Sequence, residues 1–348
     1  MIKIVINGFG RIGRLFLRRV IDHPDIEVAG INDLGDIENL AYLFKYDTVY
    51  GQFPAEVSQT TRGKRGQARN YLVVNGREIL ILQEKDPAKL PWKDLAIDVV
   101  IESTGAFESF EAAQAHLKAG AKKVILTAPA KDKDGGLSRT ILVGVNEDDL
   151  KLCDLSSNAS CTTNAAAPVI AIMAENPGIK KAILNTVHGY TATQGLVDSV
   201  TRGKDFRRGR AAGQNIVPST TGAAMALTRA FPLLEGKFDG IALRVPTITG
   251  SIADITFISQ RKTTEKEINE IFRQAAVSQK WQGILAVTEE QIVSSDIIGD
   301  PRAAIVDLNF TKVVGGDLVK VLVWYDNEWG YVETLMIHLL KVVKLIKK

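Results

Sequence analysis

The stretch that decides the fold is Ile2-Lys3-Ile4-Val5-Ile6-Asn7-Gly8-Phe9-Gly10-Arg11-Ile12-Gly13. An apolar run that ends in a GxGxxG pattern and continues into a helix is typical of a dinucleotide-binding strand–helix–strand unit. In such a unit Gly8 permits the tight turn, Gly10 lets a pyrophosphate approach the backbone, and Gly13 lets helix and strand pack closely. Asp33, twenty residues beyond Gly13, stands where a carboxylate accepts a hydrogen bond from the adenosine ribose. A glycine-rich turn with a capping aspartate is the alternative interpretation.

Outward from this stretch, strand and helix patterns alternate through the first half of the chain. Short apolar or β-branched runs predict strands, and stretches with a 3.6-residue apolar period predict helices. Their alternation predicts an α/β fold with a parallel, doubly wound sheet and helices on both faces. The predicted strands are 2–6, 26–31, 71–74, 78–82, 98–101, 123–126 and 140–143, and the predicted helices are 11–21 and 109–119.

The second half of the chain has longer strand runs with fewer helices between them. This pattern predicts an α+β domain with a mixed, largely antiparallel sheet. Between His188 and Pro218 lie about thirty residues without clear periodicity, and a loop that long is usually functional. Residues 1–159 with a final helix at 328–348 are expected to form one domain, and residues 160–327 the other. The predicted helix here is 161–175, and the predicted strands are 179–187, 240–245, 252–258, 303–308 and 318–325.

Composition argues against several classes of protein. The 348 residues carry 43 Lys and Arg against 40 Asp and Glu, and a net charge of +3 gives no reason to expect a nucleic-acid or membrane partner. Two cysteines cannot staple a secreted domain, and the four histidines show no zinc spacing with them, so we expect no metal site. The N-terminal residues enter a strand and lack a signal-peptide pattern, so a reducing, cytoplasmic location is expected.

Cys161 is the candidate nucleophile. It lies in Ser157-Asn158-Ala159-Ser160-Cys161-Thr162-Thr163-Asn164, in the first turn of a predicted helix, where the helix dipole and free N–H groups favour a thiolate and an oxyanion. His188 ends a later strand, and a histidine from another element can activate such a cysteine. A free cysteine is more often a small buried hydrophobe, which is the interpretation given to Cys153. The histidines assigned structural roles are His23, in a turn, and His116 and His338, on predicted helices without a nearby partner.

Seven blocks of sequence, in order along the chain, carry a resemblance to one enzyme family. The blocks are Ile6-Asn7-Gly8-Phe9-Gly10-Arg11-Ile12-Gly13-Arg14, Lys45-Tyr46-Asp47-Thr48, Ser157 to Asn164, His188-Gly189-Tyr190-Thr191, Ser219-Thr220-Thr221-Gly222-Ala223-Ala224, Arg244-Val245-Pro246-Thr247 and Trp324-Tyr325-Asp326-Asn327-Glu328-Trp329-Gly330. In these blocks the chain resembles the phosphorylating glyceraldehyde-3-phosphate dehydrogenases, essentially from end to end. The resemblance implies an N-terminal Rossmann domain that binds NAD and a catalytic domain that follows it.

The resemblance also implies a reaction at Cys161 and His188. The thiolate attacks the aldehyde of glyceraldehyde 3-phosphate, His188 accepts a proton, and hydride passes to NAD. Inorganic phosphate then attacks the thioester and releases 1,3-bisphosphoglycerate. Two phosphate sites are implied, and hydroxyls, a backbone N–H and Arg side chains suit phosphate oxygens. One site would use Thr191 and Arg244, and the other Ser160, Thr162, Arg208, Thr221 and Gly222; in the second site Arg207 or Arg210 could replace Arg208.

The family pattern further implies how NAD is held and how copies associate. Asn327 would hold the nicotinamide carboxamide. The loop 190–214 matches a segment that in the family lies near a neighbouring subunit's cofactor, which implies a homotetramer. Besides Gly8, Gly10 and Gly13, the implied cofactor-binding positions are Arg11, Ile12, Asp33, Lys85, Thr127 and Asn327.

This sequence departs from the family pattern at several positions. Ala165 replaces a second cysteine common four residues after the nucleophile, which removes an easy disulfide route. Lys85 replaces an arginine often found near the adenine, and lysine lacks the planar fork. The proline that helps NAD-restricted members exclude a 2′-phosphate is absent from Ser199-Val200, although Asp33 still opposes that phosphate by charge. We expect a preference for NAD with some tolerance of NADP.

Three alternative functions remain to be weighed. Erythrose-4-phosphate dehydrogenases share the nucleophile but lose the segment that here is Thr221 to Ala224, and they alter the residues after the catalytic histidine. A non-phosphorylating aldehyde dehydrogenase needs a general base for water, and no glutamate lies beside Cys161 in the sequence. A nucleotide-sensing or RNA-binding scaffold would not need the Cys161 and His188 pair.

Overall fold

The computed structural model describes residues 1–64, 68–201 and 203–347, which divide into two compact units. Unit 1 comprises Met1–Ile141, Asp148–Asn158 and Leu335–Lys348, and unit 2 comprises Leu142–Glu147 and Ala159–Thr334. Lys348 of the predicted final helix and Arg202 of the predicted long loop lie outside the described residues. The domain limits given above stay a prediction.

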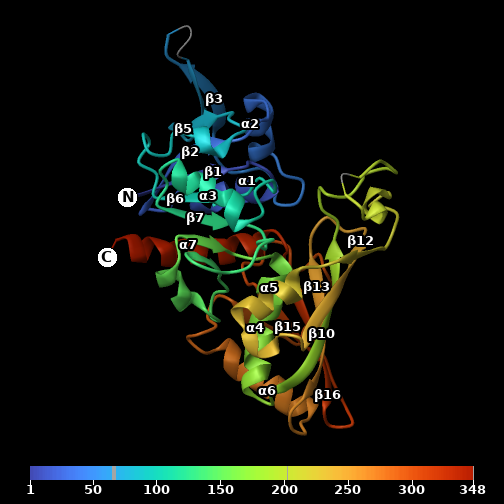
Figure 1. The fold of residues 1–348 in the computed structure, drawn as a ribbon. Coiled ribbons are helices and arrows are strands. Elements are labelled where there is room, and N and C mark those ends of the chain that lie inside the picture. Colours follow the sequence, from blue (N-terminus) through green and yellow to red (C-terminus); the bar gives the residue numbers. More distant parts are fainter. Residues whose placement is uncertain (65–67, 202, 348) are drawn as a thin grey trace. The chain divides into compact units, whose positions relative to one another are not determined.

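Unit 1 is built on a sheet whose described strands follow the order β3-β4-β5-β2-β1-β6-β7-β9-β8 (Figure 1). All neighbours pair in parallel except β3 with β4 and β4 with β5. The strand order reverses between β1 and β6, and this position is the switch point of the sheet. In sheets of this kind, ligands usually bind in the crevice at the carboxyl ends of the strands beside the switch point. The strands are β1 (Ile2–Asn7), β2 (Ile26–Asn32), β3 (Val57–Arg62), β4 (Arg69–Val74), β5 (Arg77–Leu82), β6 (Val99–Glu102), β7 (Lys123–Leu126), β8 (Ser138–Thr140) and β9 (Leu155–Ser157).

The helices of unit 1 connect the parallel strands and cover the sheet. The right-handed crossover rule places α1 and α3 on opposite faces, because their crossovers run to opposite sides of the switch point. Ile4, Val5 and Ile6 of β1 are fully buried, as expected for a strand covered on both faces. The helices are α1 (Arg11–Val20), α2 (Ile37–Lys45) and α3 (Phe110–Lys118), and the last helix, α7 (Trp329–Ile346), enters this unit at Leu335.

Most of the predicted elements of unit 1 are confirmed, and one strand was wrongly placed. The strand predicted at 140–143 is instead β8, which ends at Thr140. The apolar residues that follow it are buried in a turn, where Val145 N–H donates to Leu142 O (3.0 Å). Their apolar character therefore reflects burial rather than strand pairing. Helix α2 and strand β3 were not predicted. Helix α2 is short, and the residues of β3 do not alternate between apolar and polar side chains.

Unit 2 has a mixed sheet whose described strands follow the order β11-β12-β10-β13-β16-β15-β14 (Figure 1). Pairs β10 with β12 and β14 with β15 are parallel and the others antiparallel, which confirms the predicted mixed sheet. The strands are β10 (Ile179–Gly189), β11 (Val217–Thr220), β12 (Phe238–Val245), β13 (Ser251–Ser259), β14 (Leu285–Thr288), β15 (Ala304–Val314) and β16 (Leu318–Tyr325).

Three helices cover one face of the unit 2 sheet: α4 (Cys161–Glu175), α5 (Ala223–Ala230) and α6 (Glu265–Ala276) (Figure 1). Helix α4 has the bounds predicted from the sequence and is buried along almost its whole length. Helix α6 was missed, although Thr264 caps it by accepting a hydrogen bond from Glu267 N–H. Within the described residues, no helix is both long and apolar enough to cross a membrane.

Candidate active site

The loop between β1 and α1 in unit 1 has the geometry of a pyrophosphate-binding turn. Gly8 has φ +96°, and a Cβ atom there would lie 2.5 Å from Thr104 N. A Cβ atom on Gly13 would lie 2.2 Å from Gly8 O, whereas one on Gly10 would meet nothing within 4 Å. The first and third glycines are thus required by the protein's own packing, and the second leaves the start of α1 open. No side chain caps α1 at Gly10, so the helix terminus fits an anionic ligand.

Asp33 follows β2 and is bound to this loop. Its Oδ2 accepts a hydrogen bond from Phe9 N–H (2.6 Å), and its Oδ1 accepts one from Gly35 N–H (2.8 Å). A carboxylate oxygen has a second lone-pair site, so both oxygens keep the capacity to accept from a ribose hydroxyl. The residues of this loop therefore fit the dinucleotide predicted from the sequence.

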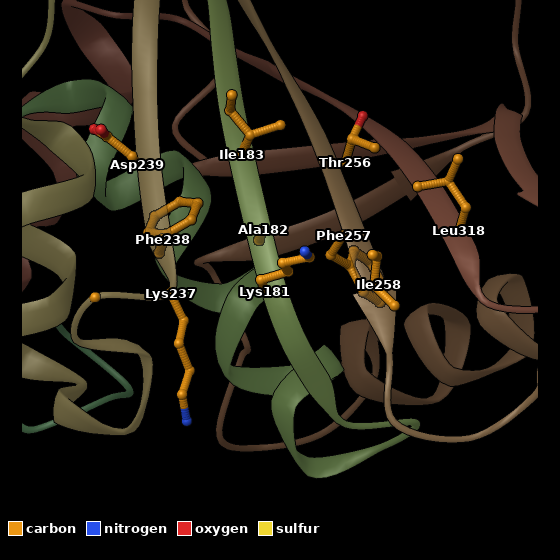
Figure 2. A pocket seen from close by; sticks show the side chains of 11 residues that line it. Lys181, Ala182, Ile183, Lys237, Phe238, Asp239, Thr256, Phe257, Ile258 and Leu318 are labelled. Atoms are coloured by element: carbon orange, nitrogen blue, oxygen red, sulfur yellow. The ribbon is translucent and has the colours of Figure 1, made fainter.

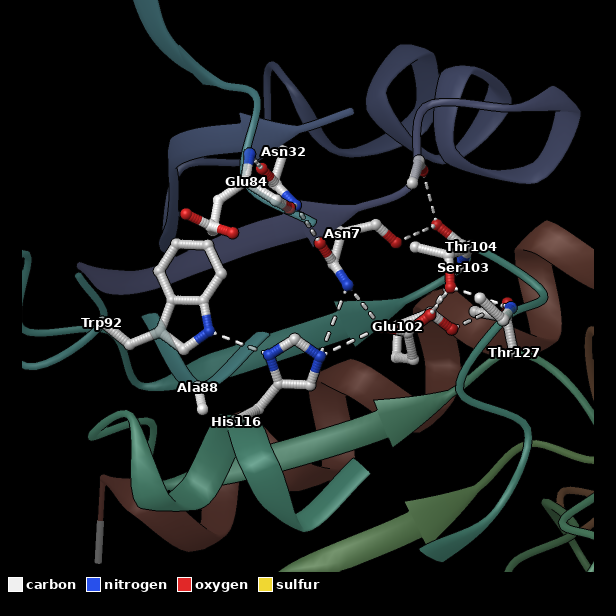
Figure 3. Close-up of polar contacts among 12 residues, drawn as sticks. Asn7, Asn32, Glu84, Ala88, Trp92, Glu102, Ser103, Thr104, His116 and Thr127 are labelled. Carbon is white, nitrogen blue, oxygen red and sulfur yellow. Dashed lines mark hydrogen bonds and ion pairs between the residues drawn. The ribbon is translucent and has the colours of Figure 1, made fainter. Parts of the chain in front are cut away.

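A buried polar network lies beneath the switch point of unit 1 (Figure 3). Asn7 and Glu102 are paired at the ends of β1 and β6, and Asn7 Nδ2 donates to Glu102 Oε2 (2.5 Å). Trp92 Nε1 donates to His116 Nδ1 (2.9 Å), which leaves Nε2 of the neutral ring to donate to Glu102 Oε2 (3.0 Å). Thr104 N–H donates to Glu102 Oε1 (2.9 Å). The prediction that His116 has no partner is wrong, because its partners come from distant segments.

The other predicted cofactor residues of unit 1 are placed as follows. The Arg11 guanidinium forms an ion pair with the buried carboxylate of Asp47. Thr127 Oγ1 donates to Glu102 O (3.0 Å), so Thr127 stands at the same sheet edge as the network. Ile12 is half-buried in the first turn of α1, and Lys85 is exposed after β5.

In unit 2, α4 and β10 bring Cys161 and His188 together. Cys161 is the first residue of α4, and Ser160 caps the helix by accepting a hydrogen bond from Thr163 N–H (3.1 Å). His188 lies on β10, and its Nε2 is 3.3 Å from Cys161 Sγ. The two residues are 27 positions apart in the chain, so the sheet and the helix that packs on it create the pair.

Burial of this pair favours a neutral thiol beside a neutral imidazole. Burial, together with the nearby Arg244, lowers the pKa of His188 to about 3, although the contact with Gly189 O raises it in part. Burial also raises the pKa of the Cys161 thiol, and Arg244 and the hydrogen bonds of Thr162 offset only part of that. Burial thus acts against the thiolate that the start of the helix is expected to favour. A neutral imidazole is the form that can accept the thiol proton.

Arg244 lies on the far side of the imidazole from the thiol. His188 Nδ1 is 2.6 Å from Gly189 O, and Arg244 Nη1 is 2.5 Å from the same nitrogen and 3.2 Å from the same carbonyl oxygen. A guanidinium only donates, so in this position Arg244 donates to the Nδ1 lone pair, which places the ring proton on Nε2. An Nδ1–H group can bond to Gly189 O only when Arg244 moves away. The parallel pairing of β10 with β12 places His188 directly beside Arg244.

Tyr325, which was not predicted as a site residue, links both elements of the pair. Tyr325 Oη lies 2.9 Å from Thr162 Oγ1 and 2.7 Å from Thr186 Oγ1, and its ring is edge-on to His188. Burial raises the pKa of Tyr325 above its ordinary value, so it stays a neutral phenol. Two signals were present: Tyr325 lies in a block quoted above, and Thr186 shares a strand face with His188.

The predicted phosphate-binding residues of unit 2 form two groups. Arg208 Nη2 donates to Ser219 Oγ (2.6 Å), and Thr193 Oγ1 joins Arg208 (3.2 Å) to Thr191 (2.9 Å). Thr221 Oγ1 accepts from Ala223 N–H (3.2 Å). Gly222 opens α5 with open space where a side chain would be. In the described part of the chain no hydrogen bond joins this second group to Arg208. Of the neighbouring arginines, Arg207 pairs with Asp205, which Arg208 also contacts (3.6 Å), and Arg210 pairs with Asp198.

Two family models cover most of the chain. Residues 2–110 match the NAD binding domain of glyceraldehyde 3-phosphate dehydrogenase, and residues 160–327 match its C-terminal domain. The chain belongs to the glyceraldehyde-3-phosphate dehydrogenase family. The resemblance stated from the sequence blocks is thereby confirmed.

Individual glyceraldehyde-3-phosphate dehydrogenases are similar to this chain over nearly their whole length. The enzyme of Thermotoga maritima is 48% identical over 334 residues, which are 95% of this chain and 96% of that one. The enzyme of Streptomyces coelicolor is 47% identical over 338 residues, 96% of each chain. Glyceraldehyde-3-phosphate dehydrogenase 1 of Kluyveromyces lactis is 44% identical over 337 residues, 97% of this chain and 98% of the yeast one.

Membership of the glyceraldehyde-3-phosphate dehydrogenase family makes this chain an NAD-dependent oxidoreductase. The glycine loop and Asp33 of unit 1 are the residues that fit NAD.

Proposed function

We propose that this enzyme oxidises glyceraldehyde 3-phosphate to 1,3-bisphosphoglycerate through a thioester on Cys161, with NAD and inorganic phosphate. One observation carries the proposal. Cys161 Sγ lies 3.3 Å from His188 Nε2 at the start of a helix, and Arg244 lies against the other side of the ring. This arrangement supplies a nucleophile, a base and an anion-binding group within one unit.

The first half of the reaction uses His188 as the base. His188 Nε2 takes the thiol proton, Cys161 Sγ bonds to the aldehyde carbon, and the carbonyl oxygen then receives that proton to give a hemithioacetal. The N–H groups at the start of α4 stabilise the oxyanion before it is protonated. His188 next accepts the hydroxyl proton as the carbon loses a hydride, and bound NAD supplies the acceptor for that hydride. The product on the enzyme is a thioester.

The second half returns the enzyme to its starting state. An oxygen of inorganic phosphate attacks the thioester carbon, the C–S bond breaks, and Cys161 leaves as a thiolate that regains its proton from His188. We assign one phosphate to Thr191 and Arg244 and the other to Ser160, Thr162, Arg208, Thr221 and Gly222, as predicted from the sequence. An anion that draws Arg244 toward itself leaves Gly189 O to the Nδ1–H group of His188, which fixes Nε2 as the acceptor.

The decisive experiment measures NADH formation as a function of inorganic phosphate. We expect activity with glyceraldehyde 3-phosphate to require phosphate and to vanish in Cys161→Ser, with NAD binding retained. Cys153→Ser is the matched control and should keep full activity. Activity that persists without phosphate would contradict the phosphorylating reaction. A higher kcat/KM for erythrose 4-phosphate would instead support the alternative of an erythrose-4-phosphate dehydrogenase.

For the cofactor, we propose a preference for NAD with measurable use of NADP. The fixed carboxylate of Asp33 repels a 2′-phosphate, whereas Ser199-Val200 lack the proline associated with its exclusion. Steady-state kinetics with both cofactors test this. We expect Asp33→Asn to raise the kcat/KM ratio of NADP to NAD, and the complete absence of NADP activity in the unaltered enzyme would refute the tolerance.

We further propose that the enzyme acts as a homotetramer in the cytoplasm. The face of the unit 2 sheet opposite helices α4 to α6 carries exposed apolar side chains, among them Ile183, Ile241 and Leu318. A pocket of about 510 Å³ lies on this face. Figure 2 shows side chains that line it, among them Ile183, Phe238, Ile258 and Leu318. Exposed apolar side chains that cluster on one sheet face favour burial against another copy of the chain.

A further inference from the structure

The side chain of Asn327, two residues after the end of β16 in unit 2, lies against two buried hydroxyls. Ser251 Oγ donates to Asn327 Oδ1 at 2.7 Å, and Thr249 Oγ1 lies 3.2 Å from the same oxygen. Ser251 is 1% exposed and Asn327 6% exposed. The antiparallel pairing of β13 with β16 places Ser251 opposite Tyr325, two residues before Asn327.

The hydrogen-bond directions in this group are determined by their donors. Gly189 N–H can only donate, and it donates to Ser251 Oγ (3.2 Å). The single hydroxyl proton of Ser251 is then available for Asn327 Oδ1. With the amide reversed, Asn327 Nδ2 would face Ser251 Oγ, and the buried serine proton would lose its acceptor. The orientation with Oδ1 toward Ser251 is therefore the one that satisfies every group.

This orientation leaves the amide NH₂ group of Asn327 as the group available to a ligand. In the described part of the chain Asn327 Nδ2 donates to no other residue, whereas Oδ1 accepts from Ser251 and shares the Thr249 proton with Asp326 Oδ1. An NH₂ group recognises a hydrogen-bond acceptor. The nicotinamide carboxamide offers one acceptor, its carbonyl oxygen, and one donor, its NH₂ group.

We infer that Ser251 is a positioning residue that orients Asn327 to donate to the carboxamide oxygen of the nicotinamide, so that the carboxamide NH₂ is not required for binding. The inference rests on the proposed role of Asn327. Gly189 adjoins His188, so the same serine connects the strand that carries the base with the residue that holds the nicotinamide.

A cofactor analogue tests the direction of this hydrogen bond in the unaltered enzyme. The acetylpyridine analogue of NAD keeps the carbonyl oxygen and replaces the NH₂ group by methyl. By titration calorimetry we expect NAD and the analogue to bind with dissociation constants within about threefold of each other, because a net hydrogen bond is worth roughly five- to tenfold or more. Binding of the analogue more than tenfold weaker than NAD would show that Asn327 accepts from the NH₂ group and would overturn the inference.

Variants then test the role of Ser251. We expect Ser251→Ala to weaken NAD binding by roughly tenfold while leaving ADP-ribose, which lacks the nicotinamide, unchanged. Ser259→Ala is the matched control, since Ser259 lies on the same strand, is fully buried and donates to Arg261 O, and it should affect neither ligand. Equal weakening of NAD and ADP-ribose by Ser251→Ala would mean a merely structural role and would overturn the inference.

A substitution at Asn327 separates the inference from its premise. Asn327→Asp can still accept from Ser251 but presents a second acceptor to the ligand, so it should bind NAD more tightly than the acetylpyridine analogue. If instead Asn327→Ala binds NAD as tightly as the unaltered enzyme, the proposed role of Asn327 fails. That outcome would remove the premise that Asn327 binds the nicotinamide. A wrong hydrogen-bond direction would instead change only the binding of the acetylpyridine analogue.

Discussion

The two cysteines of this chain have different neighbours, although burial raises the pKa of both thiols. Cys161 begins a helix and faces an imidazole, whereas Cys153 is buried in unit 1 with its S–H group directed at Leu150 O (3.8 Å). Burial raises the pKa of Cys153 to about 11. Oxidation requires a thiolate that the oxidant can reach. Cys153 is buried, whereas Cys161 is half-buried and lies beside the base His188, so Cys153 is expected to be inert.

Peroxide should therefore modify this enzyme without forming an internal disulfide. Ala165 replaces the usual second cysteine on α4, and Cys153 is too deeply buried to form a disulfide with Cys161. We expect peroxide to convert Cys161 to sulfenic and higher acids, with no Cys153–Cys161 link in non-reducing peptide mass analysis. Cys153→Ser should be inactivated at the same rate. A readily formed link between the two cysteines would contradict this expectation.

At the scale of single elements, the loop between β1 and α1 uses its glycines for different purposes. Gly13 has backbone of Gly8 against it, whereas Gly10 faces open space. We expect Gly13→Ala to lower the free energy of unfolding by about 1–3 kcal/mol, because the added methyl group overpacks the contact between helix and strand. Gly10→Ala should unfold like the unaltered protein but bind NAD and ADP-ribose weakly.

Urea unfolding and calorimetric titration distinguish the two variants. The pair serves as its own control, since both substitutions add one methyl group within the same turn. Tight NAD binding by Gly10→Ala would show that the pyrophosphate does not approach the backbone there.

Helix α7 places His338 in the interior of unit 1. Its Nδ1 donates to Asn158 Oδ1 (3.1 Å), and its Nε2 accepts from Ser156 Oγ (2.9 Å). The prediction that His338 has no partner is therefore wrong as well. Burial lowers the pKa of His338 to about 3, with a smaller contribution from Lys341. The folded protein keeps this ring neutral where an unfolded chain would protonate it.

Acid should destabilise the protein through this histidine. The unfolded ring binds a proton below pH ~6.5 and the folded ring only near pH 3, so stability is complete above ~6.5 and declines as the pH falls. The decline approaches about 1.4 kcal/mol per pH unit for one histidine. We expect His338→Gln to show a smaller loss of free energy of unfolding between pH 7 and pH 5 than the unaltered protein. An equal loss in both proteins would contradict this origin.

At the scale of the whole molecule, a charged side chain on the exposed face of the unit 2 sheet is expected to dissociate the proposed tetramer. Ile183 is 57% exposed on the face opposite the helices. We expect the unaltered protein to have the mass of four chains in sedimentation, and Ile183→Glu to dissociate it. Val277→Glu is the matched control, because Val277 is 87% exposed at the end of α6 and not on this face. A monomeric unaltered protein, or a tetrameric Ile183→Glu, would refute the proposal.

Local sequence pattern was sufficient for the elements whose signals lie within one segment. The buried strand β1, the helix α1 and the helix α4 have bounds close to those predicted, and the pairing of Cys161 with His188 followed from their chemistry. Contacts that depend on strand register could not be predicted from local sequence pattern. The position of Arg244 beside His188 depends on the parallel pairing of two distant strands, and the Tyr325 contacts depend on the packing of α4 against the sheet.

The division of α7 between the two units bears on the order in which the chain folds during synthesis. Unit 2 takes its part of α7 only up to Thr334, whereas unit 1 needs the residues from Leu335 onward to surround His338. The ribosome makes the strands of unit 1 first, yet it delivers the helix that completes them after all of unit 2. The half of the protein that begins translation earliest should therefore be the last to become resistant to protease.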